Sequence, residues 1–454
     1  MEPTSDLTRI LYCGDNLPLL RAHLPDECVD LLYLDPPFYS QRNYQAFFKA
    51  APASHNGHAR AAAFGDIWRW DAEGEQTYAE MLANAPAAMT RTLASLRDLL
   101  GPGSLLAYLG MMATRLFELR RVLKPTGSLY LHCDQAASHY LKLLLDSIFG
   151  PTNFRNEIVW CYKTGGASHR HFSKKHDLLF FYTKSDQYTF HALKEKSYMM
   201  HRYGFKKSEF LRDERGEYTW VYMKDVWDIP ALGAADGQRL GYPTQKPEAL
   251  LERIIRASSD EGGIVLDPFC GSGTTLATAQ RLGRGWIGIE SNYLGIAYQR
   301  YRLAQAFPDL RYTCAGGPAT LTEALQLARV DATQYRWWVL ALLCARPVGE
   351  EDRAYNAGIA HGILPASPGE LAPSLVLVAL EQLEMATVQY VCELIEKGNA
   401  GRVLIITLET PSVQAIRAAF TRVLKRASAF SSSIEIRTVA DLLASPLSSL
   451  KKHI

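Results

Sequence analysis

The 454-residue sequence predicts an α/β fold in which helices cover a mostly parallel β-sheet. Short apolar segments alternate with helical patterns along the first two thirds of the chain, which is typical of strands joined by crossover helices. Several of these apolar segments stop at an acidic residue, as at Asp15, Asp35 and Asp267. Because ligands of such sheets bind beyond the carboxyl ends of the strands, chemistry is expected at these positions.

Seven segments have the length and apolar character of buried strands. They are Ile10–Cys13, Val29–Leu34, Ser128–His132, Glu157–Cys161, Leu178–Tyr182, Ile264–Leu266 and Trp286–Ile289. A polar segment at 41–75 is expected to be a mobile loop, and a helix rich in Ala, Leu and Met is expected at Thr77–Leu100. The pattern then restarts with a strong strand at Arg402–Leu408, which indicates a second, smaller α/β domain over residues 318–454.

Composition limits the class of protein. The formal net charge is +2, so any affinity for nucleic acid must come from local basic patches. No uninterrupted apolar run approaches the roughly 18 residues of a membrane span, and the first residues are polar and acidic, unlike a signal peptide. The eight cysteines form no C-x-x-C pair, which disfavours a metal or disulfide framework and favours a cytoplasmic location.

The segment Asp267–Thr275 (DPFCGSGTT) follows an expected strand and opens a helix. Its two glycines let the backbone approach a ligand closely, and the helix N-terminus offers free N–H groups. The Lys of a phosphate-binding P-loop is missing, which argues against nucleotide hydrolysis. The next strand ends in Glu290, where an acidic side chain suits ribose hydroxyls. A simple turn is the structural alternative, but the combination favours an adenosine-containing cofactor.

A second motif, Asp35–Phe38 (DPPF), follows the apolar strand Val29–Leu34. Its two residues Pro36 and Pro37 fix φ and lack N–H donors, so the chain leaves the strand stiffly. The amine of a nucleobase is a poor nucleophile because its lone pair is delocalised into the ring. A carboxylate and a backbone carbonyl that accept its protons would localise that pair. The ring of Phe38 could stack on a base flipped out of the duplex, although an acidic strand cap followed by a proline turn is the alternative.

The two motifs resemble those of the DNA amino-methyltransferases, which methylate exocyclic amines of bases. The resemblance implies a Rossmann-like methyltransferase sheet with S-adenosylmethionine as the cofactor. It assigns Asp35 and the Pro36 carbonyl to the target amine, with Pro37 completing the motif and Phe38 stacking on the base. The residues that it assigns to the cofactor are Asp267, Phe269, Gly271, Gly273, Thr274, Thr275 and Glu290.

The catalytic motif precedes the cofactor loop by 232 residues, whereas most methyltransferases have the opposite order. This order resembles the permuted, or beta, class of these enzymes, in which a target-recognition region lies between the motifs. It divides the chain into a catalytic part at 1–159, a target-recognition region with sheet strands at 160–240 and a cofactor-binding part at 241–317. The resemblance of the flanking segments also places Asp15 and Lys246 at the cofactor.

Residues 160–207 contain ten Lys or Arg against three Asp or Glu, with eleven aromatic residues and five His interleaved. Such a segment fits a surface that contacts phosphates and bases of double-stranded DNA, while a solvated basic face is the alternative. The resemblance also suggests a homodimer and a cognate restriction enzyme as partners, in restriction–modification or phage defence. The best candidates for DNA contacts are Lys174, Lys175, Lys206, Lys207 and Arg42.

The C-terminal part resembles the nuclease-like domains that are fused to some of these methyltransferases, on the basis of Arg336–Ala341 and Ala345–Pro347. Active members have Gly-Ile-Asp and then a strand that ends at a Lys, which hold Mg²⁺ and the scissile phosphate. The matching segments here are Gly358–His361 and Leu377–Glu381, and both the Asp and the Lys are missing from them. We therefore expect a nuclease-like fold without cleavage, retained for contacts with DNA or protein.

The motif Asp35–Phe38 favours transfer to N6 of adenine, because cytosine-N4 enzymes more often begin this motif with Ser. Cytosine-N4 transfer stays open as an alternative, and so does a non-catalytic DNA-binding module. A protein-glutamine methyltransferase is disfavoured, since such enzymes usually have Asn-Pro-Pro-Tyr and the opposite motif order. The chemistry needs no metal and no cysteine nucleophile, so Cys270 in the glycine loop is expected to be a small packing residue.

Overall fold

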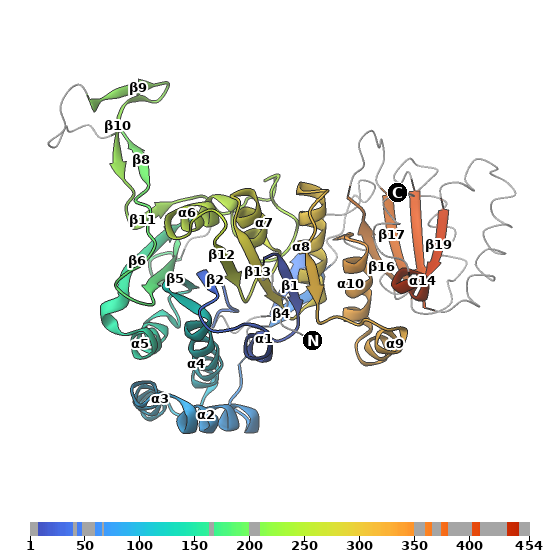
Figure 1. Ribbon diagram of the computed structural model, residues 1–454, viewed down its shortest axis with the longest axis horizontal. Helices are drawn as coiled ribbons and strands as arrows, with labels where there is room; N and C mark the ends of the chain where they lie inside the picture. The colour runs from blue at the N-terminus through green and yellow to red at the C-terminus, as the bar shows by residue number, and fades with distance from the viewer. Residues whose placement is uncertain are drawn as a thin grey trace, which may run out of the picture.

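The computed structural model is built around a nine-stranded sheet with helices on both faces (Figure 1). A narrow three-stranded arm projects from one end of this body. A five-stranded sheet lies at the other end, along the long axis. The structure describes residues 8–39, 43–47, 60–65, 68–162, 168–198, 209–348, 359–365, 374–379, 402–408 and 434–444.

The central sheet contains all seven strands that the sequence predicts. Its order is β11 (Val226–Asp228), β6 (Phe154–Cys161), β7 (His176–Thr183), β5 (Leu123–Cys133), β2 (Val29–Leu34), β12 (Ile264–Asp267), β13 (Gly285–Glu290), β1 (Ile10–Cys13) and β14 (Thr313–Ala315). Neighbours run parallel, except that β7 is antiparallel to both β5 and β6. The Rossmann-like α/β fold class is therefore confirmed.

Alternate residues of β2 enter two different hydrophobic cores, because successive side chains of a strand point to opposite faces. Leu32 and Leu34 belong to one core cluster, whereas Leu31 and Tyr33 belong to the other. The first core is covered by α1 (Asn16–His23), α4 (Ser104–Val122) and α5 (Ser138–Phe149), and the second by α6 (Glu248–Ser258), α7 (Thr274–Arg281) and α8 (Tyr293–Ala306). Burial on both faces explains why these strands are apolar at nearly every position.

The two sequence motifs meet in the middle of the sheet. Strand β2 ends at Leu34 and its parallel neighbour β12 ends at Asp267, with Leu32 opposite Leu266. From β2 the chain proceeds outward to β5, and from β12 it proceeds the other way to β13. This is a topological switch point, where the loops after the two strands diverge and leave a crevice for a ligand.

The expected single helix over Thr77–Leu100 is wrong. The structure contains two helices, α2 (Ala72–Asn84) and α3 (Ala87–Leu100), separated at Ala85 and Pro86. Proline disfavours a helical conformation of the preceding residue and cannot donate the helical hydrogen bond, so the helix ends before it and a new one starts after it.

The segment 41–75 contains regular structure where the sequence indicates a loop. Strands β3 (Asn43–Phe47) and β4 (Arg60–Gly65) form an antiparallel pair. Helix α2 begins within the same segment, with Asp71 as its N-cap. Residues 41–42, 48–59 and 66–67 lie outside the described residues. The expected mobile loop falls largely on them and stays a prediction.

The projecting arm consists of β8 (Lys194–Ser197), β9 (Leu211–Asp213) and β10 (Gly216–Tyr222) (Figure 1). It is reached from the end of β7, where Thr183 pairs with Ser128. That end of β7 lies at the amino edge of the parallel strands, opposite the edge at which Asp35 follows β2. A short 3₁₀ helix (Pro151–Asn153) leads into β6 at the same amino edge.

Two helices connect the central sheet to the C-terminal sheet, α9 (Leu321–Val330) and α10 (Ala332–Leu342). The sheet has the order β15 (Arg346–Val348), β16 (Ile359–Ile363), β17 (Ser374–Ala379), β18 (Arg402–Thr407) and β19 (Ile434–Thr438), followed by α14 (Val439–Ala444). The predicted strand Arg402–Leu408 corresponds to β18. Within the described ranges, no helix is both long and apolar enough to cross a membrane.

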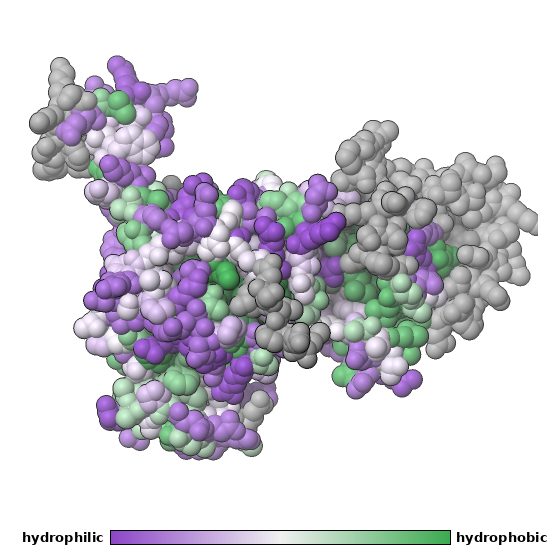
Figure 2. Space-filling view, viewed as in Figure 1, coloured by the Kyte–Doolittle hydropathy of each residue, from purple (hydrophilic) through white to green (hydrophobic). Residues whose placement is uncertain are grey.

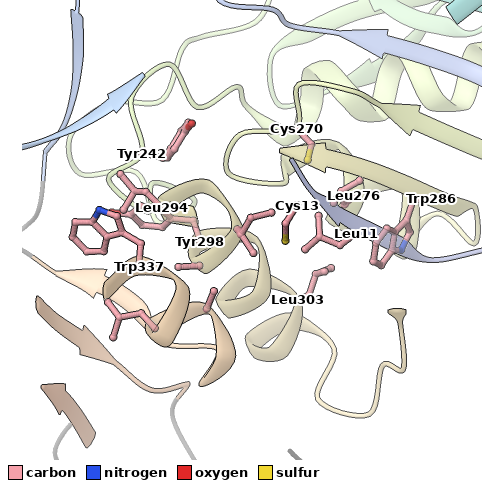
Figure 3. Packing of buried hydrophobic residues seen from close by; sticks show 14 of the residues in the cluster. Leu11, Cys13, Tyr242, Cys270, Leu276, Trp286, Leu294, Tyr298, Leu303 and Trp337 are labelled. Carbon is pink, nitrogen blue, oxygen red and sulfur yellow. The ribbon is translucent and has the colours of Figure 1, made fainter. Parts of the chain in front are cut away.

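The second α/β unit shares a hydrophobic core with the first. Trp337 of α10 lies beside Leu294 and Tyr298 of α8 (Figure 3). The same cluster of buried residues continues to Val376 in β17 and Ile406 in β18. Burial of large apolar side chains across this junction favours a fixed arrangement over a flexible tether.

Candidate active site

Both motifs open into one cavity of about 890 Å³ at the switch point between β2 and β12. Asp35–Phe38 line one part of it, and Asp267–Ser272 line another together with Glu290. Ligand pockets commonly measure roughly 300–1,000 Å³, so this cavity has room for a nucleoside-sized cofactor together with a base. The fold therefore brings together the two motifs that the sequence keeps far apart.

Asp267 holds the glycine loop in shape. Its Oδ1 accepts the backbone N–H of Phe269 at 3.0 Å, and its Oδ2 accepts the Thr275 hydroxyl at 2.6 Å. Burial raises the pKa of Asp267 to about 7, and these two hydrogen bonds offset the effect only in part. Because both oxygens are engaged within the loop, Asp267 and Thr275 support the cavity wall rather than offer free ligands.

Gly271 and Gly273 occupy positions that a side chain would not fit. Both have left-handed backbone, with φ of +47° and +75°. A Cβ atom at Gly273 would lie 2.7 Å from Cγ of Gln299, and one at Gly271 would lie 3.1 Å from the ring of Tyr242. Gln299 also donates to the Gly271 carbonyl at 2.6 Å. Gln299 thus holds the loop in place, and the loop lines the cavity.

Glu290 ends β13 and faces this loop. Its Oε2 accepts the backbone N–H of Gly271 at 2.9 Å, and its Oε1 accepts that of Asn292 at 2.9 Å. Burial raises the pKa of Glu290 to about 7. Each carboxylate oxygen can accept a second hydrogen bond, so Glu290 retains capacity for hydroxyl donors in the cavity. The adjacent Cys270 is buried, and its thiol donates to the Ile289 carbonyl at 3.2 Å, as expected of a packing residue.

Asp35 at the exit of β2 forms an ion pair with Lys246. Nζ of Lys246 lies 2.5 Å from Oδ2 of Asp35 and donates to the Thr244 carbonyl at 3.2 Å. The two side chains are only 8% and 17% exposed, so water screens the pair weakly. Nζ also lies 5.4 Å from the ring centroid of Phe38. The resemblance implied that Lys246 lies at the cofactor; in the structure its charged group contacts the carboxylate of Asp35 within the same cavity.

A buried polar network lies behind Asp35, and sequence reasoning missed it. His132 of β5 is fully buried, with Nε2 3.3 Å from Asp177 and Nδ1 3.1 Å from the Tyr33 hydroxyl. Nδ1 is also 3.8 Å from Oδ1 of Asp35. Burial opposes ionisation of Asp177, but hydrogen bonds from His132 and Tyr162 lower its pKa below the ordinary value. These hydrogen bonds fix the orientation of the His132 ring, which lies beside Asp35.

Asp15 lies at the cavity, where the sequence predicts a cofactor contact, and is held by a residue that the sequence did not reveal. Its carboxylate accepts from Arg115 of α4 at 2.8 and 2.9 Å and caps α1 through the Leu17 N–H. Arg115 also donates to Asn16 at 2.6 Å, and Asn16 donates to the Pro268 carbonyl at 2.8 Å. Polar contacts therefore connect α4 and the end of β1 to the glycine loop.

The outer wall of the cavity comes from α4 and from the segment before α2. Trp68, Arg69 and Asp71 line it from that segment. The ring of Trp68 packs on Tyr108 of α4, with 5.3 Å between the ring centroids. This part of the segment 41–75 therefore reaches the cavity.

The loop at 168–175 is the part of the predicted DNA-contacting segment that lies at the same edge of the sheet as the cavity. It follows β6 and precedes β7, so it lies at the edge of the sheet that carries Asp35. Lys174 is exposed, Lys175 is half-buried, and Phe172 is completely exposed. Hydrophilic side chains cover much of the visible face of the central body (Figure 2). Position and exposure both suit contacts with DNA phosphates.

Other residues of the predicted DNA-contacting segment 160–207 lie in the core of the sheet or outside the described residues. Most side chains of β7 are buried in the sheet, so its aromatic residues stabilise the core and do not read bases. The buried aromatic residues of β7 are Phe180, Phe181 and Tyr182. The predicted DNA contacts Lys206, Lys207 and Arg42 lie outside the described residues.

Comparison with known proteins identifies the family. A family model described as DNA methylase matches residues 29–298, which is more than half of the chain. The chain belongs to the DNA methylase family. The match includes both motifs and every strand from β2 to β13 of the central sheet.

Individual relatives of this DNA methylase cover different shares of it. Type II methyltransferase M.HpaI of Haemophilus parainfluenzae is 35% identical over 201 residues, which are 44% of this chain and 60% of that protein. DNA adenine methyltransferase YhdJ of Escherichia coli is 26% identical over 341 residues, 73% of this chain and 96% of that protein. The solved PvuII DNA methyltransferase (cytosine-N4-specific) is 17% identical, with 65% of this chain and 86% of that one covered and a TM-score of 0.40. The chain thus spans 60% of the length of the first relative.

The cavity of this DNA methylase fits S-adenosylmethionine, the cofactor of the family. The glycine loop lines the cavity through Gly271 and Ser272, and Gly273 packs against Gln299 on the side away from it. Glu290, at the end of the neighbouring strand β13, lines the cavity and can accept hydrogen bonds from the hydroxyl groups of a ligand. The donor and acceptor set is that of a nucleoside site, and Asp35 lies in the same cavity.

Proposed function

We propose that this DNA methylase transfers a methyl group from S-adenosylmethionine to N6 of adenine in double-stranded DNA. The observation that carries the proposal is the single cavity into which Asp35–Phe38 and the glycine loop at 267–275 both open. A DNA-binding module without catalysis would need neither a cofactor cradle nor a carboxylate paired with a buried cation beside it. Joint exposure of the two motifs in one cavity therefore favours an enzyme.

The residues on the base side act on the amine that is methylated. S-adenosylmethionine supplies an electrophilic methyl group when bound. Lys246 engages Oδ2 of Asp35, and the carboxylate has further acceptor capacity for an N–H of the exocyclic amine, which draws the lone pair of the amine out of the ring. Phe38 stacks on the flipped base. The new C–N bond would form as the S–CH3 bond of the cofactor breaks and S-adenosylhomocysteine leaves. The methylated amine would then be positively charged and would lose one proton, which the Asp35 carboxylate would accept.

Adenine is favoured over cytosine by two observations. The motif begins with Asp35 rather than Ser, and the relative that aligns with 73% of this chain is named a DNA adenine methyltransferase. Cytosine-N4 transfer is the alternative, because a carboxylate can accept a proton from either planar amine.

Nucleoside mass spectrometry distinguishes the two bases. Purified protein is incubated with S-adenosylmethionine and unmethylated genomic DNA, with the Asp35→Ala variant as control. We expect N6-methyladenine that is absent from the variant reaction. N4-methylcytosine would contradict the choice of base, and no methylated base despite bound cofactor would contradict the function.

Recognition of DNA is proposed for the region at 160–240, between the two motifs as in the permuted class. The exposed loop at 168–175 supports this role, since it lies at the edge of the sheet where Asp35 is found. Restriction–modification is the proposed setting, and two relatives are named Type II methyltransferases. A homodimer and a cognate restriction enzyme stay predictions from the resemblance.

For the C-terminal part at 318–454 we propose a nuclease-like domain that does not cleave DNA. Strands β16 and β17 are antiparallel neighbours, with Ala360 opposite Val378, so the two matching segments lie side by side. The position expected to carry the metal-binding Asp is Ala360. Incubation with Mg²⁺ and unmethylated plasmid tests this proposal, and nicking that persists through purification would contradict it.

A further inference from the structure

One wall of the cofactor cavity comes from outside the segment that matches the family. Gln334 of α10 lines the cavity together with Glu290 and Asn292, whereas the family match ends at residue 298. Its Oε1 accepts the backbone N–H of Tyr293 at 2.9 Å. Tyr293 is the first residue of α8 and follows Glu290 by three positions. The C-terminal part therefore reaches the residues that are expected to hold the cofactor ribose.

Helix α10 is held firmly in this place. Its N-cap Asp331 accepts the backbone N–H groups of Thr333 and Gln334, each at 2.9 Å. One turn further, Trp337 is buried and packs beside Leu294 of α8 (Figure 3). The buried contact of Trp337 thus fixes α10, and with it the position of Gln334 at the cavity.

The linker to α9 and α10 also lies directly against the cavity edge. Gly316 has φ of +92°, and a Cβ atom there would lie 2.2 Å from the Cys13 carbonyl oxygen. A Cβ atom at Gly317 would contact Trp338 at 3.4 Å and Tyr293 at 3.8 Å. The chain can cross the end of β1 this closely only because Gly316 has no side chain, whereas a Cβ atom at Gly317 would make ordinary contacts. Gly14 and Asp15, which follow β1, line the cavity beside this crossing.

The Gln334 amide has one hydrogen-bonding group left for a ligand. Because the Tyr293 N–H is a donor, the oxygen of the amide must face it, which fixes Nε2 as the other end. Among the residues that the structure describes, no acceptor takes a hydrogen bond from this Nε2. Nε2 is a donor at a cavity wall that also contains Glu290 and Asp15.

We propose that Gln334 is a cofactor-binding residue that donates from Nε2 to the adenosine half of S-adenosylmethionine. The proposal rests on the proposed function, which supplies the cofactor, and adds that the C-terminal part completes its site. Cofactor binding and docking of α10 on α8 are then coupled, and the coupling must act equally in both directions. A ligand that shifts α10 would change the cofactor affinity, and the cofactor would tighten the C-terminal part.

Calorimetric titration with S-adenosylhomocysteine tests the contact in three variants of the full chain. Gln334→Met removes both hydrogen-bonding groups at similar size, whereas Gln334→Glu keeps an acceptor for the Tyr293 N–H and removes only the donor. We expect both variants to bind roughly 3- to 10-fold more weakly than the wild type. Thr333→Ala, at an exposed position of the same helix turn, should bind like the wild type. Titration at 0.5 M salt screens the charge added in Gln334→Glu.

A purely structural role of Gln334 gives a different pattern. If only the bond to Tyr293 matters, Gln334→Met binds weakly and Gln334→Glu binds normally, which would overturn the proposal. Equal binding by all variants would overturn it too. Hydrogen exchange gives an independent readout, since amides of 331–342 should exchange more slowly when S-adenosylhomocysteine is present, and unchanged exchange would refute the coupling. Failure of the wild type to bind S-adenosylhomocysteine would instead contradict the proposed function itself.

Discussion

Nζ of Lys246 lies 2.5 Å from Oδ2 of Asp35, and this ion pair joins two segments that are 211 residues apart in the chain. The cation neutralises the carboxylate in a place that water barely reaches and limits its rotation by holding Oδ2. His132 and the groups bound to it support the same carboxylate from the other side. The position of Asp35 thus depends on residues from β5, β7 and the segment before α6.

Replacement of Lys246 tests whether it serves the base or the cofactor. In Lys246→Met, Asp35 loses its partner and its fixed orientation, so we expect the single-turnover rate of methyl transfer to fall roughly 10- to 100-fold. Affinity for S-adenosylhomocysteine should change less than about twofold, corresponding to about 0.4 kcal/mol. The two quantities are measured by rapid quench and by calorimetric titration.

A matched control is available at the opposite edge of the sheet. Lys184 is also little exposed and pairs with Glu27 at 3.0 Å, far from the cavity. Lys184→Met should lower the melting temperature without slowing methyl transfer. A large loss of cofactor affinity in Lys246→Met, with an unchanged rate of methyl transfer, would show instead that Lys246 binds the cofactor, as the resemblance implies.

Two glycines with the same backbone conformation separate crowding from backbone strain. Gly273 and Gly283 have φ of +75° and +74°, but only a Cβ atom at Gly273 meets a neighbour, Gln299. Gly283→Ala should cost about 1–2 kcal/mol of unfolding free energy, from the left-handed backbone alone. Gly273→Ala should cost roughly 1–3 kcal/mol more and weaken cofactor binding. Urea denaturation and titration measure both effects, and equal losses would show that the loop has room for a side chain.

Cofactor affinity should depend on pH through Glu290, whose pKa burial raises from 4.5 to about 7. Hydroxyl donors bind the ionised form more strongly, so affinity should rise several-fold as pH rises from about 6 to 8, with release of a proton. Glu290→Gln should bind more weakly and lose most of this dependence. The sign is opposite for stability of the free protein. Because the folded state holds this proton more tightly, the contribution of Glu290 falls as pH rises from 4.5 to about 7.

Titrations at pH 6, 7 and 8 in two buffers of different ionisation enthalpy count the protons released. Asp267 also has a pKa raised to about 7 by burial, but its oxygens are engaged within the loop. A pH dependence that survives in Glu290→Gln would therefore assign the titration to Asp267 and contradict the ribose role.

The loop at 168–175 should contribute to DNA affinity through charge. Each phosphate contact that is lost lowers the slope of log affinity against log salt by about 0.9, so Lys174→Ala should reduce it by about 1 and the double variant with Lys175→Ala by about 2. Arg91→Ala, at an exposed position of α3 outside the region at 160–240, should leave the slope unchanged. Fluorescence anisotropy from 50 to 300 mM salt gives these slopes. Equal slopes in all variants would show that DNA phosphates contact a different surface of the protein.

The strands and the two motifs could be predicted because their signals are local. β1 and β2 have the predicted bounds, since each is a short apolar run that stops at Gly14 or Asp35. The break between α2 and α3 could have been predicted from Pro86. Helical periodicity concealed it, because both helices have the same apolar character.

The supporting residues of the site could not be predicted because they depend on strand order. His132 and Asp177 lie next to apolar stretches of their strands, and nothing local indicates that antiparallel β7 lies against β5 and brings them together. Lys246 and Gln334 face the cavity only through contacts between distant segments. A polar residue near the end of a buried strand is the one signal that could have identified His132.

Single-turnover transfer of a labelled methyl group tests the central claim most directly. Enzyme in excess over unmethylated DNA is mixed with S-adenosyl-[methyl-³H]methionine, and label in N6-methyladenine is followed for the wild type and for Asp35→Ala. We predict transfer by the wild type and a rate at least about 100-fold lower for the variant, whose affinity for S-adenosylhomocysteine is retained. Equal rates for the two proteins would contradict the role of Asp35, and with it the assignment of this cavity as the site of methyl transfer.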